Sequence, residues 1–203
     1  VLKKELQAGR LTQRAIRRSK QASLKRQGLG KITHAISIKD RPASVDDRAV
    51  PGHWEGDLLG GTHNSNIATL VERQSRYVML AKIKQKTADT VAAALIKQAQ
   101  RLPTELYKSL TWDRGSEMAN HRQFTLATKI AVYFCDPKSP WQRGSNENTN
   151  RLLRQYFPKG TDLSRYTQAQ LNQVARHLNE RPRKTLDYAT PAEKFQACVA
   201  ATG

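Results

Sequence analysis

The stretch HWEGDLLG (His53–Gly60), with SNIATLVERQSRYVMLAKI (Ser65–Ile83) after it, decides the fold. The first segment predicts one strand. The second predicts two strands joined by a short polar turn at Arg73–Ser75, because apolar and β-branched residues flank a polar break. The chain therefore begins its folded part with a three-stranded meander.

Helices and strands alternate after this meander. Thr87 as N-cap and Pro103 beyond the end bound an alanine-rich helix. The later segments predict a strand YKSLTWD that ends at Asp113, a helix ANHRQFTLATK and a strand IAVYFC. A helix SNENTNRLLRQYF follows, capped by Ser145 and ending near Pro158. Two further helices begin with capping boxes, Thr167 with Gln170 and Thr190 with Glu193, and the second has Pro191 at its first position. This order predicts an α/β fold with a mixed five-stranded sheet flanked by helices.

The chain is strongly basic. Its 203 residues are 38% hydrophobic, which suffices for one sizeable core. The 35 Lys and Arg against 17 Asp and Glu give a formal net charge of +18, and the pI is about 10.3. Such a field attracts phosphate polymers, so we expect nucleic acid as partner. No apolar run is long enough to span a bilayer and no signal peptide is visible, so we expect no membrane association.

Half of the net charge lies at the start of the chain. Residues 1–31 contain ten Lys or Arg and one acid, Glu5. This density favours a DNA-contacting arm over a solvated linker, although the apolar residues are too sparse to predict a firm amphipathic helix. We predict a basic arm and linker over residues 1–50 and a catalytic domain over residues 51–203. The start at Val1 suggests a fragment or a processed form.

The two cysteines argue against a cysteine-based zinc site. Cys135 lies in the apolar run IAVYFC and is expected to be a buried hydrophobe, although a pair with Cys198 is conceivable. This cysteine usage fits a reducing cytoplasm.

Three carboxylates occupy positions where an α/β sheet presents functional groups. Asp57 lies inside the first strand, Asp113 ends the fourth, and Glu147 lies on the first turn of the helix after the fifth. Carboxylates that converge repel one another and need a cation, and hard oxygen ligands suit Mg²⁺ or Mn²⁺. Two such ions about 3.5–4 Å apart would clamp an in-line phosphoryl displacement.

Four motifs carry a resemblance to a known family. HWEGD, TWDRGSE, SPWQRGSNENTN and LNERPRKTLDYATPAEKF resemble the catalytic core of bacterial DDE-type insertion-sequence transposases, in the branch named after insertion sequence thirty. The resemblance covers roughly residues 41–195, and 33 residues separate Asp113 from Glu147, as in that branch.

The resemblance implies a ribonuclease-H-like fold with Asp57, Asp113 and Glu147 as catalytic and metal-binding residues. It also implies two Mg²⁺ ions, for which Mn²⁺ would substitute, cleavage at transposon ends and strand transfer into target DNA by a homo-oligomer. Transposases of this kind usually carry a helix-turn-helix region before the core, whereas the sequence shows only the basic arm. Either the chain is a fragment or end recognition lies elsewhere.

The residue pattern of the helix that carries Glu147 predicts a surface that faces DNA. Asn150, Arg151 and Arg154 follow Glu147 at i+3, i+4 and i+7 on one face. The alternative is that Glu147 only favours the helix dipole and pairs with Arg151. The DNA-binding set that we predict from this helix, the loop before it and the arm is Arg143, Asn150, Arg151, Arg154, Lys138, Arg17 and Arg18.

Three further side chains are ambiguous. Glu55 shares a strand face with Asp57 and either assists the metal site or is a strand-edge acid. Glu117 lines the site or, as we favour, begins a helix in solvent. His121 is the histidine nearest to Asp113 in sequence.

Two other functions remain open beside a transposase. One is a catalytically silent DNA-binding module derived from a transposase. The other is a nuclease on the same fold, which uses water where a transposase uses a 3′-hydroxyl. The intact acids favour catalysis over the silent module.

Overall fold

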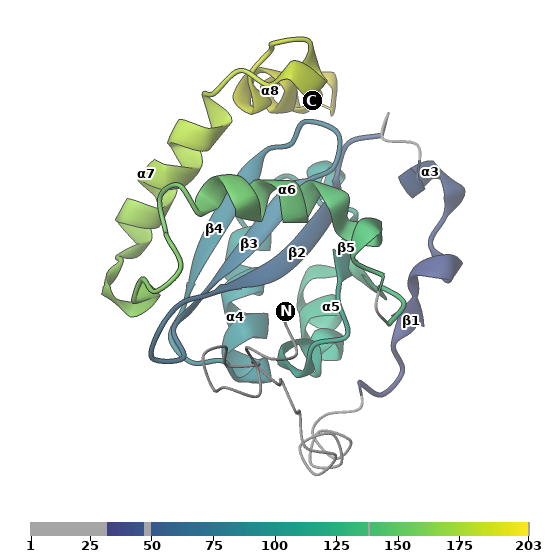
Figure 1. Cartoon of the computed structure of the whole chain (residues 1–203). Coiled ribbons are helices and arrows are strands. Elements are labelled where there is room, and N and C mark those ends of the chain that lie inside the picture. The colour runs from purple at the N-terminus through teal and green to yellow at the C-terminus, as the bar shows by residue number, and fades with distance from the viewer. Residues whose placement is uncertain (1–31, 47–49, 138, 203) are drawn as a thin grey trace, which may run out of the picture. The chain divides into compact units, whose positions relative to one another are not determined.

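The sheet at the centre of the molecule has six strands in the order β1-β6-β5-β2-β3-β4 (Figure 1). The computed structural model describes residues 32–46, 50–137 and 139–202. Predictions that fall on Arg17, Arg18 and Lys138 lie outside these residues. The strands are β1 (Ile36–Ser37), β2 (His53–Gly60), β3 (Asn66–Glu72), β4 (Val78–Ile83), β5 (Ser109–Trp112) and β6 (Ala131–Phe134).

The helices connect and cover the strands. The α-helices are α3 (Ala43–Asp46), α4 (Ala88–Ala99), α5 (His121–Thr128), α6 (Gly144–Leu153), α7 (Gln168–Asn179) and α8 (Pro191–Thr202). The 3₁₀ helices are η1 (Ile38–Asp40), η2 (Thr104–Leu106), η3 (Ser116–Met118), η4 (Pro140–Arg143), η5 (Leu163–Arg165) and η6 (Lys184–Leu186).

The pairing is mixed. β3 is antiparallel to both β2 and β4, whereas β5 and β6 run parallel to β2, as does β1 to β6. An α/β fold with a mixed sheet is thereby confirmed, in the ribonuclease-H-like class. The sheet has one strand more than expected, because β1 lies within the predicted linker. Two residues are too few to show a strand period in the sequence.

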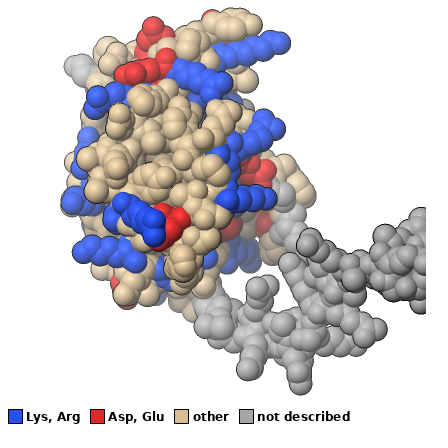
Figure 2. All heavy atoms as spheres, turned by 60° about the vertical axis from the view of Figure 1, so that its left-hand side comes forward, with Lys and Arg blue, Asp and Glu red and all other residues tan. Residues whose placement is uncertain are grey.

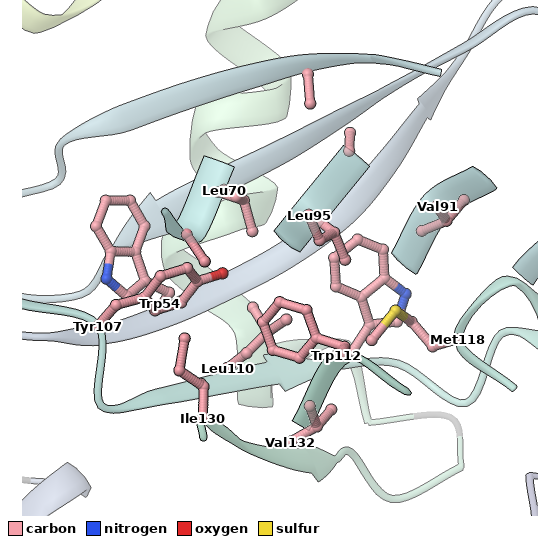
Figure 3. Close-up of a cluster of buried hydrophobic side chains, with 14 of the residues drawn as sticks. Trp54, Leu70, Val91, Leu95, Tyr107, Leu110, Trp112, Met118, Ile130 and Val132 are labelled. Carbon is pink, nitrogen blue, oxygen red and sulfur yellow. The ribbon is translucent and has the colours of Figure 1, made fainter. Parts of the chain in front are cut away.

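Strand alternation gives the sheet two buried faces. Trp54 and Leu70 point to the face covered by α4 and α5, where they join a cluster with Leu95 and Trp112 (Figure 3). Residues one position along each strand, such as Ile67, point to the opposite face, which α6 and α7 cover (Figure 1). Side chains of β2 at odd positions, Asp57 among them, therefore lie under α6.

Local helix signals were mostly correct. The side chain of Thr87 caps α4, and the capping box of Thr167 with Gln170 opens α7. Thr190 and Glu193 exchange the same pair of hydrogen bonds at the start of α8. The expected cap at Ser145 is wrong, because α6 begins at Gly144 and the Ser145 hydroxyl instead accepts a hydrogen bond from Arg76.

Within the described residues, no helix is long and apolar enough to cross a membrane. Cys135 and Cys198 are not joined by a disulfide, and Cys135 is buried as expected.

Candidate active site

Asp57 lies near the middle of the sheet on the face that α6 covers. β2 places it opposite Thr69 of β3. Its Oδ2 atom accepts a hydrogen bond of 3.0 Å from the amide of Asn150, and its Oδ1 atom accepts one of 2.8 Å from the backbone N–H of Leu58. Glu147 precedes Asn150 by three residues on α6, so it lies on the flank of the helix beside the face turned toward Asp57.

Asp113 immediately follows β5, the parallel neighbour of β2. Its Oδ1 atom accepts a hydrogen bond of 3.0 Å from the backbone of Gly115, so the carboxylate organises the turn after the strand. The side chain is 40% exposed. It borders a cavity of about 390 Å³ that Cys135, Asp136 and Arg143 also line. The carboxylate is therefore accessible from solvent.

Arg143 joins the two aspartates. One terminal nitrogen, Nη1, lies 3.4 Å from Oδ1 of Asp57, and the other, Nη2, lies 3.3 Å from Oδ2 of Asp113. Nη1 also donates a 2.9 Å hydrogen bond to the carbonyl of Gly56. The side chain is only 9% exposed, and its Nε atom is buried without a partner among the described residues. Two acids from different strands thus share one buried cation.

The charges at this site perturb one another. Burial raises the pKa of the Asp57 carboxyl above its usual value, and Asp113 adds to this effect while Arg143 opposes it. For Arg143, burial favours the neutral form, but the carboxylates of Asp57 and Asp113 outweigh burial and raise its pKa. The guanidinium is therefore held in its charged form.

Glu147 stands apart from this pair. It lies on the first turn of α6, as predicted, but its side chain is exposed. Within the described part of the chain its carboxylate has no hydrogen bond or ion pair, and no three His, Cys, Asp or Glu side chains are close enough to hold a metal ion. The alternative that Glu147 pairs with Arg151 has no support, because the Arg151 guanidinium donates to Asn148 at 2.9 Å.

A buried polar network that the sequence did not reveal positions α6. The side chain of Asn146 is fully buried, and its amide nitrogen donates to the carbonyls of Glu55 at 2.9 Å and Thr69 at 3.3 Å. Its Oδ1 accepts from the Thr69 hydroxyl at 3.0 Å. The only available signal was an asparagine beside Glu147, which gives no reason to expect burial.

Glu55 belongs to the same network, so the expectation of a strand-edge acid was wrong. It is 1% exposed and forms an ion pair of 3.2 Å with Arg73. Its second oxygen accepts a 2.9 Å hydrogen bond from the backbone N–H of Asn146. Glu55 is thus an internal acid that caps α6.

The two remaining ambiguous side chains lie in the core. Glu117 is buried, accepts a hydrogen bond of 3.4 Å from the Trp112 indole and lies 3.8 Å from Lys86, so it does not begin a helix in solvent. His121 is also buried, with its ring edge-on to Phe134.

The predicted DNA-binding residues differ in how exposed they are and in whether they already have partners within the protein. Arg151 is exposed. Arg154 is half-buried and donates to the carbonyl of Gly60 at 3.0 Å. Arg143 and Asn150 are engaged with the aspartates. Trp141 in η4, just before Arg143, is 72% exposed. Figure 2 shows Lys and Arg side chains at many places on the visible face, with Asp and Glu at fewer.

Comparison with known proteins identifies the class. Residues 47–140 match the integrase core domain family. A transposase of insertion sequence element IS30A from Escherichia coli K12 is 54% identical over 171 residues, which are 84% of this chain and 45% of that protein. A transposase of IS1086 from Cupriavidus metallidurans is 51% identical over 172 residues, which are 84% of this chain and 51% of that protein.

A more distant transposase, of IS4351 from Bacteroides fragilis, is 38% identical over 184 residues, which are 90% of this chain and 56% of that protein. The protein thus contains an integrase core. Within that class, the identity over most of the chain supports an IS30-like transposase catalytic core. The chain spans about half the length of the curated relatives it matches.

Proposed function

We propose that this chain is the catalytic part of a DNA transposase, which cleaves DNA at transposon ends and transfers the 3′-hydroxyl to target DNA. The observation that carries this proposal is the joining of Asp57 and Asp113 by Arg143 across the parallel strands β2 and β5, beneath α6, the helix whose first turn bears Glu147. Transposases and integrase cores generally depend on divalent metal ions.

The residues at this site fit such an ion. Asp57, Asp113 and Glu147 offer the hard oxygen atoms that Mg²⁺ and Mn²⁺ prefer. The Oδ1 atom of Asn150, whose amide nitrogen contacts Asp57, is buried without a partner in the part of the chain that the structure describes, and supplies one more oxygen. These three acids would hold two Mg²⁺ ions, with Mn²⁺ able to substitute. When bound, the metal neutralises charge on the phosphate and activates the attacking oxygen.

The chain's own residues would orient the DNA. Arg151 is exposed on α6 four residues after Glu147, which places a guanidinium beside the acids for a phosphate of the backbone. Arg154, Asn150 and Arg143 lie along the same helix or just before it, and Lys138, Arg17 and Arg18 extend the proposed contact set. The substrate would be double-stranded DNA, both transposon ends and target, bound by a homo-oligomer.

A strand-transfer assay with pre-cut transposon ends tests this function. The protein carries any further N-terminal region of its natural sequence, and Mn²⁺ supplies the metal. Joined product that is lost in Asp57→Asn supports a transposase. Hydrolysis without joining indicates a nuclease, and DNA binding with neither reaction indicates a silent binding module.

A further inference from the structure

The negative charge at the proposed metal site is already partly balanced by the protein itself. Arg143 contacts a carboxylate oxygen of Asp57 at 3.4 Å and one of Asp113 at 3.3 Å. Its position is fixed further by the Gly56 carbonyl. The preceding residue, Gln142, is tied to Asp136 by two hydrogen bonds, of 2.8 and 3.2 Å, which close the loop that carries Arg143.

A divalent cation and this guanidinium would compete for the same oxygens. Both are positive, and the Arg143 side chain is buried, so water screens their mutual repulsion less than it would on the surface. A cation bound by both aspartates therefore requires Arg143 to withdraw or to tolerate a like charge within a few ångströms. A withdrawn guanidinium would be free to bind a phosphate.

The exposed position of Glu147 agrees with a competition between the Arg143 guanidinium and a divalent cation. Its carboxylate is exposed and remains outside the cluster that Arg143 joins. Two ionised aspartates with one arginine leave one net negative charge, so a third acid is repelled rather than drawn inward. Glu147 would approach only after a cation of higher charge replaces the guanidinium.

We propose that Arg143 is the internal counter-ion of Asp57 and Asp113, and that it weakens divalent metal binding by the free chain. This proposal rests on the proposed function, since it assumes that the two aspartates are metal ligands. It assigns to Arg143 a role toward the metal that is separate from contact with DNA.

Calorimetric titration of the free chain with MnCl₂ tests the proposal without any measurement of activity. Arg143→Gln should bind Mn²⁺ at least about fivefold more tightly than the parent chain, the lower end of typical coupling between sites. Arg143→Lys keeps the charge and should remain within about twofold of the parent, since like charge sustains the repulsion. Unchanged or weaker binding in Arg143→Gln would overturn the proposal.

Two further variants make the result specific. Lys97→Gln removes one positive charge from an exposed position on α4, on the other face of the sheet, and should leave the affinity within about twofold because screened distant charges matter little. Asp57→Asn should abolish the Mn²⁺ binding. If Asp57→Asn binds Mn²⁺ as tightly as the parent chain does, the metal lies elsewhere and the proposed catalytic site is refuted. Equal Mn²⁺ affinities of Arg143→Gln and the parent chain would instead refute only the counter-ion role of Arg143.

A spectroscopic measurement covers the case in which Arg143→Gln does not fold. In a ¹⁵N-labelled parent chain, the Arg143 Nε–H signal is identified by its absence in Arg143→Lys. Because this nitrogen is buried beside the two acids, titration with Mg²⁺ should shift its signal as the site saturates. A signal that stays in place while Mg²⁺ saturates the site would rule out the displacement of Arg143.

Discussion

The carboxylate of Glu55 accepts a hydrogen bond of 2.9 Å from the backbone N–H of Asn146, and so fastens the first turn of α6 to β2. A carboxylate at this position also stabilises the helix, because it lies near the positive end of the helix dipole. The next residue along the helix is Glu147. The position of the third proposed catalytic acid therefore depends on a buried contact between a strand and a helix that are about 90 residues apart in sequence.

Asn146→Ala should destabilise the fold by about 1–3 kcal/mol, because it leaves the buried hydroxyl of Thr69 and two carbonyl groups with fewer partners. Urea unfolding followed by circular dichroism measures the change. Asn148→Ala, two residues along at an exposed position, should change stability by no more than about 0.5 kcal/mol. Equal effects at the two positions would contradict the role of the network.

Glu147→Gln should abolish cleavage and strand transfer while DNA binding persists. The change is nearly isosteric on an exposed helical turn, so the fold loses little, but one anionic oxygen donor for the metal is removed. A gel-shift titration and a strand-transfer assay on one preparation measure both properties. Glu180→Gln, at an exposed acid after α7, is the control and should remain active. Substantial activity in Glu147→Gln would refute its catalytic assignment.

Gly56→Ala should destabilise the fold by about 1–3 kcal/mol through overpacking. A Cβ atom at this position would collide with the indole ring of Trp112, which is fully buried. Gly144→Ala provides the contrast, since its added Cβ meets no atom within 4 Å and its backbone is helical. Thermal unfolding should show a lower Tm for the first variant and an unchanged or higher Tm for the second.

Because of His53, the free energy of unfolding should decrease as the pH is lowered. Burial, followed by the charges of Lys108, Arg73 and Arg41, lowers its pKa from 6.5 to about 4. A group of this kind is protonated more readily when unfolded, so its contribution is complete above about pH 6.5 and is lost as pH falls toward 4. The slope attributable to it is at most about 1.4 kcal/mol per pH unit.

Urea unfolding at several pH values between 4 and 7.5 measures this slope. In His53→Gln the fall in stability with acid should be shallower than in the parent chain. The same replacement at the exposed His177 controls for the substitution itself. Identical pH profiles for His53→Gln and the parent would exclude His53 as the source.

Removal of residues 1–31 should weaken DNA binding and flatten its dependence on salt. The segment carries ten Lys or Arg against one acid. When fewer phosphate contacts form, fewer counterions are released from the DNA on binding, so the affinity depends less on salt. Fluorescence anisotropy with a DNA duplex at several salt concentrations gives the slope. A truncated chain with the same slope as the parent would show that the segment does not contact phosphate.

The sequence alone determined the order of the main helices and strands from His53 onward. The bounds of β2 match the predicted segment His53–Gly60, and the caps at Thr87 and Thr167 are where their local hydrogen bonds require them. It also placed Asp57 in a strand, Asp113 at a strand end and Glu147 on a first helical turn. These features depend on residues that are neighbours along the chain, so periodicity and capping chemistry reveal them.

Only the tertiary structure decided which of these side chains meet. The contact of Arg143 with both aspartates depends on the parallel pairing of β2 with β5 and on the docking of α6 over β2, and neither is encoded in a local pattern. For the same reason Glu55 and Glu117, which resemble site or surface acids in sequence, lie buried with partners of their own. A charged side chain is stable in a core only when its partner is brought to it, and the fold brings partners from distant parts of the chain.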